Sequence, residues 1–434
     1  MREDEFELNQ NMEETEETVS SHKKDKKPGV GTGIAIGCGG SIFLLAVVIL
    51  VGVVIVQKFM PSWFRVQNTY VNAADIPDNR GLNLERVNAK LQTLQTLIEN
   101  RFLFETDTKK IEDGIYSGMI AGLDDPYSQY YNEESYKEMT EDNAGVYTGV
   151  GALLQEDRVN NTITVIRVFE GSPAEEAGMK AGDVIYKVED IYAAEMDMDQ
   201  LVSSHIRGAE GTVVHITVIR DGEEVLLTIT RRSIDTPTVE NKMLENNIGY
   251  ISVSQFAMNT SEQFINALEK LKADGAKSLI IDLRDNPGGV LDAAVAMADY
   301  ILPDGGLITY TADKTGIGAK YYAQDEHEED LPIVLLVNEN SASASEVFTG
   351  ALKDYGRVTI IGKQTFGKGI VQSFIPLGDD TAVKLTVEHY YTPEGFDLHG
   401  EGIAPNKEVE LNEKCEAYGD ENDNQLAEAV KILK

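Results

Sequence analysis

The sequence predicts an α/β domain with a largely parallel sheet, preceded by a smaller strand-rich domain, a helical region and one N-terminal transmembrane helix. Three observations support this prediction. Strand and helix patterns alternate after residue 248, short strands and glycine turns fill residues 145–232, and a long uncharged apolar run lies near the N-terminus. At 434 residues the chain is long enough for about three units.

The first of these elements is the apolar run. No charged residue lies between Lys27 and Lys58, and about 20 apolar residues are enough to span a bilayer as a helix. A cleaved signal peptide is the alternative, but it would need a shorter apolar region followed by an Ala-x-Ala-like site. The segment Gln57-Lys-Phe-Met60 does not provide such a site. We therefore expect an uncleaved anchor over residues 28–57.

The charges on either side of the anchor predict its orientation. Four lysines lie between residues 23 and 27, whereas the basic residues after the anchor, Lys58 and Arg65, are sparser. The positive-inside rule then places the acidic tail, residues 1–27, in the cytoplasm. We expect a single-pass protein of the cell membrane, with everything after about residue 58 extracytoplasmic.

Residues 84–139 have helical patterns. Leu84 to Ile98 carry apolar residues at three- and four-residue intervals, which indicates an amphipathic helix. A second helix, around Ile111–Leu123, is expected to end before Pro126. These helices and Gln425–Lys434 could be assembly surfaces in a homodimer, although amphipathic helices more often pack on their own domain.

From about residue 145 the pattern changes to short strands. Ile163–Val168 and Val213–Ile219 alternate like strands, and Asp221-Gly222 predicts a hairpin turn. From residue 248, strands at Ile248–Val253, Ser278–Leu283 and Ile333–Val337 alternate with helices at Thr260–Ala273 and Leu291–Ile301. Such alternation predicts a parallel sheet, in which sites gather beyond the carboxyl ends of the strands.

These changes divide the chain into six segments. Their bounds are 1–27, 28–57, 58–144, 145–235, 236–410 and, for a helical C-terminal tail, 411–434.

Composition excludes several classes of function. With 38 Lys and Arg against 73 Asp and Glu, the net charge of −35 disfavours nucleic-acid binding. Two cysteines, Cys38 and Cys415, cannot build a disulfide framework, a four-cysteine zinc site or an iron–sulfur site. The six histidines are scattered, and neither His-Glu-x-x-His nor Gly-x-Ser-x-Gly occurs. We expect no metal or other cofactor, and no Ser–His–Asp triad.

The segment Gly362–Gly369 nearly matches a phosphate-binding loop. However, Gly369 replaces the hydroxyl residue that would bind magnesium, and Ile370–Ile375 has a strand pattern. Because a phosphate loop must open a helix, nucleotide binding is disfavoured.

The same segment suggests a serine–lysine dyad. Ser341-Ala-Ser-Ala-Ser-Glu346 joins the strand at Ile333–Val337 to a following helix, and the N–H groups at a helix N-terminus can hold an oxyanion. Lys368 lies in apolar surroundings that would lower its pKa, which suits a general base. Gln372 would share its strand face and orient the amine. Alternatively, the serines only cap a helix and Lys368 is a surface lysine.

Five motifs are shared with one known family. They are Leu123-Asp-Asp-Pro-Tyr-Ser128, Asp282-Leu-Arg-Asp-Asn-Pro-Gly-Gly289, Ser341-Ala-Ser-Ala-Ser-Glu346, Thr365-Phe-Gly-Lys-Gly369 with Gln372, and Tyr391-Thr-Pro393 followed by Gly400-Glu-Gly-Ile403. In these motifs the chain resembles the carboxyl-terminal processing (tail-specific) Ser/Lys peptidases, over nearly the whole exported length. The stretch Phe396–His399 departs from the family, which usually carries more basic or polar residues there.

The resemblance implies a catalytic core of the tail-specific protease type and roles for individual residues. Ser343 would be the nucleophile, Lys368 the general base and Gln372 its orienting partner. The backbone N–H groups of Ala344 and of the Gly288-Gly289 turn would form the oxyanion hole, and the choice between the two glycines stays open.

Residues 145–235 resemble the PDZ domain that members of this family insert. Its carboxylate-binding loop would be formed by Gly149, Val150, Gly151 and Ala152, whose apolar neighbours favour substrates with apolar C-termini. Arg207 matches a position that couples peptide binding to catalysis in some relatives. It could equally form a surface ion pair.

We therefore predict a membrane-anchored serine endopeptidase that recognises protein or peptide C-termini through its PDZ domain and cleaves through an acyl-enzyme. The alternative is a non-catalytic PDZ receptor or scaffold for exported C-termini, although such a protein would have no need for Ser343, Lys368 and Gln372 together.

Overall fold

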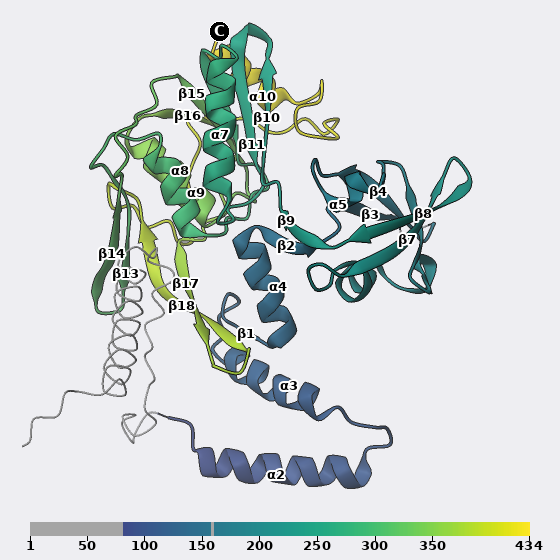
Figure 1. Cartoon of the computed structure of the whole chain (residues 1–434). Coiled ribbons are helices and arrows are strands. Elements are labelled where there is room, and N and C mark those ends of the chain that lie inside the picture. The colour runs from purple at the N-terminus through teal and green to yellow at the C-terminus, as the bar shows by residue number, and fades with distance from the viewer. Residues whose placement is uncertain (1–80, 158–159) are drawn as a thin grey trace, which may run out of the picture. The chain divides into compact units, whose positions relative to one another are not determined.

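The structure, a computed structural model, describes residues 81–157 and 160–434 (Figure 1). The predicted cytoplasmic tail, residues 1–27, and the predicted anchor, residues 28–57, lie outside the described residues. Among the helices within the described ranges, none is both long enough and apolar enough to cross a membrane. The anchor therefore stays a prediction from the sequence.

A six-stranded sheet forms the centre of the α/β part, with the order β10-β11-β12-β15-β16-β19. Only the β10–β11 pair is antiparallel, so the sheet is largely parallel, as predicted. The strands are β10 (Val239–Leu244), β11 (Ile248–Val253), β12 (Ser278–Asp282), β15 (Ile333–Val337), β16 (Val358–Gly362) and β19 (Lys407–Glu408), with a short 3-10 turn η5 (Glu245–Asn247) before β11.

Both faces of this sheet are buried. Leu279 and Ile281 of β12 belong to the core that includes Phe264 and Phe348, whereas Ile280 packs in a second cluster with Leu426 and Ala429. The alternation follows because successive side chains of a strand point to opposite faces. The helices that supply these clusters are α7 (Thr260–Ala273), α8 (Leu291–Asp299) and α9 (Ala344–Asp354) for the first and α10 (Asn424–Ile432) for the second.

A second, antiparallel sheet brings the N-terminal part of the chain to the C-terminal part. Strand β1 pairs with β18, with Gln129 opposite Lys384, and β17 pairs with the same strand β18. The motif that ends at Ser128 is thereby held next to the strand that follows Lys368. The strands are β1 (Gln129–Tyr131), β13 (Leu307–Asp313), β14 (Gly316–Tyr322), β17 (Ile370–Pro376) and β18 (Ala382–Tyr391).

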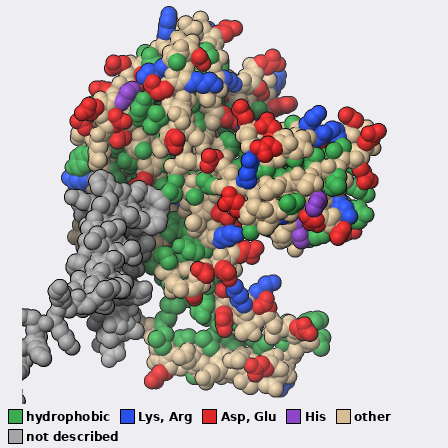
Figure 2. All heavy atoms as spheres, viewed as in Figure 1, with side chains coloured by type: hydrophobic (Ala, Val, Ile, Leu, Met, Phe, Trp, Pro, Cys, Tyr) green, Lys and Arg blue, Asp and Glu red, His purple; other side chains and the backbone are tan. Residues whose placement is uncertain are grey.

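The two predicted N-terminal helices are present as α2 (Leu84–Arg101) and α3 (Thr108–Ala121), and a third helix, α4 (Glu133–Ala144), follows them. Within the described residues, α2 and α3 bury none of their side chains. Hydrophobic atoms are visible on the surface of these helices in Figure 2. Large exposed hydrophobic residues in and after α2 and α3 include Leu84, Leu94, Leu97, Phe102, Leu103, Phe104 and Met119.

The strand-rich part has its own sheet, in the order β3-β4-β5-β7-β8, and its own core, which contains Val165, Val214 and Ile216. Asp221 and Gly222 both have positive φ, of 53° and 83°, as the predicted two-residue hairpin requires. Strand β3 lies at the edge of the sheet, and the β2–β9 pair leads into and out of this part.

The elements of this part follow in chain order. They are β2 (Val146–Gly149), β3 (Ala152–Asp157), β4 (Thr162–Val168), α5 (Pro173–Glu176), β5 (Val184–Val188), β6 (Ile191–Tyr192), η3 (Ala193–Glu195), α6 (Met198–Leu201), the π-helical turn η4 (Val202–Ile206), β7 (Val213–Arg220), β8 (Glu223–Thr230) and β9 (Arg232–Asp235).

Candidate active site

Three loops follow three neighbouring parallel strands. Residues 284–289 follow β12, residues 338–343 follow β15 and residues 363–369 follow β16. Because the carboxyl ends of parallel strands meet at one edge of a sheet, the three loops gather there. The first two are in close contact: a Cβ atom on Gly288 would lie 2.8 Å from Cβ of Ser343 and 2.9 Å from N of Ala344. Only glycine allows this approach.

Ser343 lies at the junction of strand and helix, as the N-cap of α9, and is 8% exposed. Its φ of 57° and ψ of −114° are strained for a residue other than glycine, at a cost of about 1–3 kcal/mol. Nucleophilic serines at strand-to-helix turns in other hydrolases have such strain, where Gly-x-Ser-x-Gly usually signals it. Here Ser341 and Ser345 stand in place of the two glycines, so the Gly-x-Ser-x-Gly motif is absent although the turn is present.

The three serines of this loop differ in their hydrogen bonds. The hydroxyl of Ser341 donates to the carbonyl of Leu283 at 2.7 Å, and that of Ser345 donates to the carbonyl of Asn286 at 2.9 Å. The hydroxyl of Ser343 donates to no group in the described part of the chain. Ser341 and Ser345 therefore fasten the loop, and Ser343 keeps a proton that it can give up.

The turn after β12 offers one uncommitted N–H group. The N–H of Gly288 already donates to Oδ1 of Asn286 at 2.9 Å. Gly289 is held by its neighbours, since Phe256 donates to the carbonyl of Gly288 and Val290 donates to the carbonyl of Phe256. Among residues 81–157 and 160–434, the N–H groups of Gly289 and Ala344 have no acceptor. Ala344 directly follows Ser343, and Gly289 directly follows the glycine that contacts Ser343.

A buried carboxylate joins the loop at residues 338–343, here called the serine loop, to the loop at residues 363–369, the lysine loop. Oε2 of Glu346, which is 0% exposed, accepts the backbone N–H of Ser343 at 2.9 Å and that of Lys368 at 2.8 Å. Oε1 accepts the hydroxyl of Thr365 at 2.6 Å and the N–H of Gly367 at 2.7 Å. One side chain therefore fixes the backbone of both residues of the predicted dyad.

The ammonium group of Lys368 lies over an aromatic ring. Its Nζ is 4.8 Å from the ring centroid of Tyr127, and no described carboxylate forms an ion pair with it. Burial lowers the pKa of Lys368, the positive charge of Lys384 lowers it further, and Asp125 and Glu346 oppose both effects. Within the described residues no hydrogen bond joins Lys368 to Ser343 directly, so Glu346 is their link.

The glycines beside Lys368 make room for another segment. A Cβ atom on Gly369 would lie 2.3 Å from N of His399. The N–H of Gly400 donates to the carbonyl of Gly367 at 2.9 Å, and the N–H of Ile403 donates to the hydroxyl of Thr365 at 2.7 Å. The motif Gly400–Ile403 thus braces the lysine loop, and the unusual stretch that ends at His399 packs directly against it.

The structure places Gln372 away from its predicted contact with the amine. Its Nε2 donates to the hydroxyl of Thr386 at 3.5 Å, and no hydrogen bond to Lys368 is present among the described residues. The N–H of Thr386 donates to Oγ of Ser128, whose hydroxyl donates to Asp125 at 2.6 Å. The N-terminal motif at residues 123–128 therefore belongs to the surroundings of the lysine.

The predicted carboxylate-binding loop joins β2 to the edge strand β3. Gly151 has a φ of 85°, and a Cβ atom there would lie 2.4 Å from Cβ of Ser172. The carbonyl of Val150 accepts the N–H of Ala174 at 2.8 Å. Gly149 ends β2 and Ala152 begins β3, so an added peptide strand would find its edge partner immediately after the loop.

Arg207 lies apart from the dyad. Its Nη1 is 3.4 Å from Oε2 of Glu141 in α4, and its guanidinium carbon is 4.9 Å from the ring centroid of Tyr147. Within the described residues it makes no ion pair or hydrogen bond with Ser343 or Lys368. The ion pair considered from the sequence is present, although both side chains are partly buried, at 31% and 23% exposure.

Within residues 81–157 and 160–434, one group of side chains has metal-ligand spacing. Ligand atoms of Glu269, His327 and Glu329 lie within 4.8 Å of one another. However, Nζ of Lys272 is 3.0 Å from Glu269 and 3.1 Å from Glu329. The ammonium group of Lys272 already holds the cation position, so the group is an ion-pair network.

Three family models match the chain in separate parts. The model of peptidase family S41 matches residues 247–409, that of the PDZ domain matches residues 164–220, and that of the N-terminal domain of the activating protease CtpB matches residues 52–135. The predicted PDZ segment is wider than the matched residues and includes the loop at residues 149–152.

Curated relatives match over most of their length. The probable CtpA-like serine protease of Staphylococcus aureus (strain COL) is 33% identical over 407 residues, which cover 91% of this chain and 77% of the relative. The carboxy-terminal processing protease CtpA of Bacillus subtilis (strain 168) is 36% identical over 323 residues, which cover 74% and 69%. The chain belongs to peptidase family S41. Among solved structures, the photosystem II D1 C-terminal processing protease is 29% identical to this chain, with a TM-score of 0.42. The match covers 73% of this chain and 86% of that protease.

The resemblance found in the sequence is confirmed: this S41 chain is a serine-type peptidase with a PDZ domain. Sequence reasoning missed Glu346 and Tyr127, although both lie inside the quoted motifs. A motif shows that a position matters to a family, but it does not show which distant group the side chain contacts. The sequence shows only that a glutamate ends the serine motif. Its burial, which obliges the carboxylate to find hydrogen-bond donors, is seen in the structure alone.

Glu346→Gln is expected to destabilise the S41 chain and to abolish most activity. The amide nitrogen would face two of the four donors that the carboxylate now accepts. We expect the free energy of unfolding to fall by roughly 2–6 kcal/mol, since each stranded donor costs about 1–3 kcal/mol. We also expect peptide cleavage to fall at least about 100-fold, because both loops shift. Urea unfolding and a cleavage assay would measure both effects.

The matched control is Glu138→Gln, which changes an exposed glutamate of α4 and should alter neither quantity. Wild-type stability and activity in Glu346→Gln would show that the carboxylate does not organise the site.

Proposed function

We propose that this S41 peptidase is a membrane-anchored serine endopeptidase that captures substrate C-termini in its PDZ domain and cleaves with a Ser343–Lys368 dyad. One observation carries the dyad: the same oxygen of Glu346 accepts the N–H groups of both residues. The hydroxyl of Ser343, which donates to no described group, and the lowered pKa of Lys368 support the same assignment.

In this mechanism neutral Lys368 accepts the proton from Oγ of Ser343 while that oxygen bonds to the substrate carbonyl carbon. The oxyanion of the tetrahedral intermediate accepts the N–H groups of Ala344 and Gly289. Gly289 is preferred to Gly288 because the N–H of Gly288 already donates to Asn286. The ammonium of Lys368 then gives its proton to the leaving amine, and the acyl-enzyme remains.

Water completes the reaction. Lys368 accepts a proton from the water molecule that attacks the acyl carbonyl carbon, and Ser343 leaves with that proton as its hydroxyl is restored. The ammonium that forms in each half-reaction lies against the ring of Tyr127, 4.8 Å away, where a cation is favoured. The negative charge of Asp125 also favours it. We assign Gln372 as the partner that orients the amine, after its side chain rotates away from the long 3.5 Å contact with Thr386.

The PDZ domain, proposed over residues 145–235, would receive the substrate terminus. Backbone N–H groups from Gly149 to Ala152 would hold the terminal carboxylate, and the peptide would pair with the edge strand β3. Exposed Leu153, at 46%, favours apolar residues near that terminus. Arg207, between Glu141 and Tyr147, would transmit binding to the catalytic domain, proposed over residues 236–410.

The uncharged run over residues 28–57 would anchor the protein with its acidic tail in the cytoplasm and its catalytic part outside. The exposed apolar side chains of α2 and α3 support homodimerisation as a further proposal. Cell fractionation tests the anchor: the full chain should remain with carbonate-washed membranes, and a chain that lacks residues 28–57 should not.

Ser343→Ala and Lys368→Ala are each expected to lower cleavage of an unstructured protein by at least about 1,000-fold, because removal of the nucleophile or its base disables the whole dyad. Gel electrophoresis and mass spectrometry of the products would measure the loss. The control Ser373→Ala changes a partly buried serine of β17 and should keep activity. Cleavage by the Ser343→Ala chain at the wild-type rate would disprove the dyad.

The pH profile should respond in opposite directions to two charge changes. The base must be neutral, so kcat/KM should rise with pH through the pKa of Lys368, which burial has lowered. Lys384→Gln removes a positive charge and raises that pKa, so the rising limb moves to higher pH. Asp125→Asn removes a negative charge and lowers it, so the limb moves to lower pH.

The control for this experiment is Lys90→Gln, which removes an exposed charge on α2 and should leave the limb in place. Shifts of the same sign in Lys384→Gln and Asp125→Asn, or no shift in either, would exclude Lys368 as the titrating base.

A peptide with an apolar C-terminus should raise cleavage of a second substrate when its carboxylate is free and not when it is amidated. Arg207→Ala should remove this response and leave basal cleavage. Arg167→Ala is the matched control, because Arg167 lies in the same domain and forms a comparable ion pair with Glu240. A full response in Arg207→Ala would contradict the proposed coupling role.

A further inference from the structure

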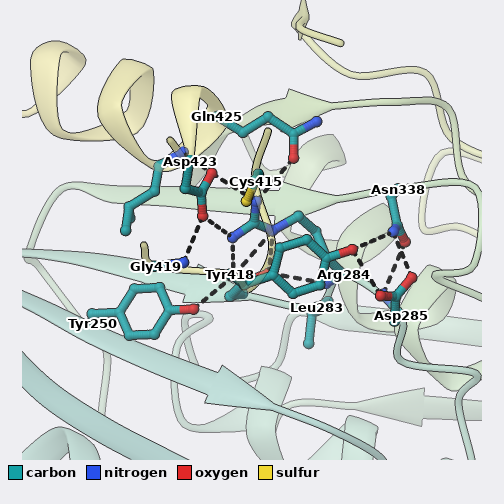
Figure 3. A network of polar contacts seen from close by, with 12 residues as sticks. Tyr250, Leu283, Arg284, Asp285, Asn338, Cys415, Tyr418, Gly419, Asp423 and Gln425 are labelled. Atoms are coloured by element: carbon teal, nitrogen blue, oxygen red, sulfur yellow. Dashed lines mark hydrogen bonds and ion pairs between the residues drawn. The ribbon is translucent and has the colours of Figure 1, made fainter. Parts of the chain in front are cut away.

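The C-terminal segment, residues 411–434, supplies partners to a buried arginine beside the active-site turn (Figure 3). Arg284 is 5% exposed. Its Nη2 lies 2.6 Å from Asp282 in β12 and 2.8 Å from Asp423, and its Nη1 donates to Oε1 of Gln425 at 2.9 Å. A buried guanidinium that loses its partners is strongly destabilising, so the turn after β12 depends on residues close to the C-terminus.

Tyr418 connects this arginine to the two loops of the active site. Its ring centroid lies 3.9 Å from the guanidinium carbon of Arg284. Its hydroxyl donates to Oδ2 of Asp285 at 2.7 Å and accepts from Nδ2 of Asn338 at 3.1 Å. Asp285 belongs to the turn at residues 284–289 and Asn338 begins the serine loop, so one phenol contacts both.

Asp285 has a left-handed backbone conformation, with a φ of 58°. This conformation is uncommon outside glycine, although aspartate adopts it more readily than most residues, and the hydrogen bonds of its side chain help to hold it. Its carboxylate also accepts Nδ2 of Asn338 at 2.7 Å and Nδ2 of Asn340 at 2.8 Å. These hydrogen bonds, with that of Tyr418, lower the pKa of Asp285 although burial opposes them.

Movement of Asp285 would reach the oxyanion donors through the next residues. The carbonyl of Asn286 accepts the N–H of Ala342 at 3.0 Å and the hydroxyl of Ser345 at 2.9 Å. Gly288 lies so close to the start of α9 that a Cβ atom there would be 2.9 Å from N of Ala344. Contacts this tight transmit small shifts instead of absorbing them.

We propose that Tyr418 is a positioning residue for the oxyanion hole. It fixes Asp285 against the serine loop and so sets the spacing between the N–H groups of Gly289 and Ala344. The C-terminal segment thereby controls stabilisation of the transition state without touching the substrate. This inference rests on the proposed function, specifically on the assignment of those two donors.

A merely structural role would make a different prediction. Leu426 and Ala429 of α10 pack against the central sheet, and the segment would then act only by fastening this helix. Tyr418→Phe separates the two roles, because it keeps the ring on Arg284 and the packing of α10 and removes only the hydroxyl that holds Asp285 and Asn338.

The full-length Tyr418→Phe chain should show a roughly tenfold lower kcat with KM within about twofold of wild type, as expected when a misplaced group acts in the transition state alone. Inhibition by a peptide aldehyde should weaken by a similar factor, since its adduct with Ser343 places an oxyanion between the same donors. Tyr300→Phe is the matched control. It removes a hydroxyl that donates to Glu269 at 3.0 Å, away from the site, and it should change neither kcat nor the affinity for the aldehyde.

Wild-type kcat and aldehyde affinity in Tyr418→Phe would overturn the proposal, as would an equal loss in Tyr300→Phe or a loss confined to KM. If a thermal melt shows Tyr418→Phe to be unfolded at the assay temperature, Asn340→Ala decides. It removes another hydrogen bond to Asp285 from an exposed side chain, and it must lower kcat and aldehyde affinity together. Cleavage that survives Ser343→Ala would refute the proposed function itself, whatever Tyr418→Phe does.

Discussion

The carboxylate of Glu346 accepts four hydrogen bonds from loops that follow two different strands, and it has no exposure to solvent. A buried charge is tolerated only when its partners are complete, because each missing donor leaves part of the desolvation cost uncompensated. The serine loop and the lysine loop must therefore dock together or not at all. The arrangement couples the positions of Ser343 and Lys368 through backbone groups, which leaves both side chains available for chemistry.

Two residues other than glycine have positive φ in the loops that follow β12 and β15: Asp285, with a φ of 58°, and Ser343, with a φ of 57°. Each is surrounded by hydrogen bonds that reach across to the other loop or to a helix. Strain of this kind persists only where the surroundings over-determine the conformation. The site thus combines two uncommon backbone conformations with a dense polar network, and the absence of a side chain at Gly288 lets the two loops approach each other.

Much of the fold could be predicted because its signals are local. The strands at Ile248–Val253 and Ile333–Val337 and the helix at Thr260–Ala273 have the predicted bounds, since periodic burial is visible within a few residues. The active site was harder to predict from the sequence. From chemistry alone the three serines could not be separated, and only family motifs favoured Ser343. The contacts that distinguish it join residues far apart in sequence: Glu346 and Lys368 are 22 positions apart, Tyr418 and Asp285 133, and Ser128 and Thr386 258. Periodicity carries no information about such pairs.

The pairing of Arg284 also sets an order of events during biosynthesis. Its partners Asp423 and Gln425 lie 139 and 141 positions later in the chain. At about 5–20 residues per second, the ribosome needs roughly 10–30 s to make them after the arginine. During that interval Asp282 is the only one of these three partners that Arg284 can contact, and the turn beside Ser343 lacks the contacts of the C-terminal segment. The turn beside Ser343 therefore gains its full set of contacts only after the C-terminal segment has been synthesised and has docked.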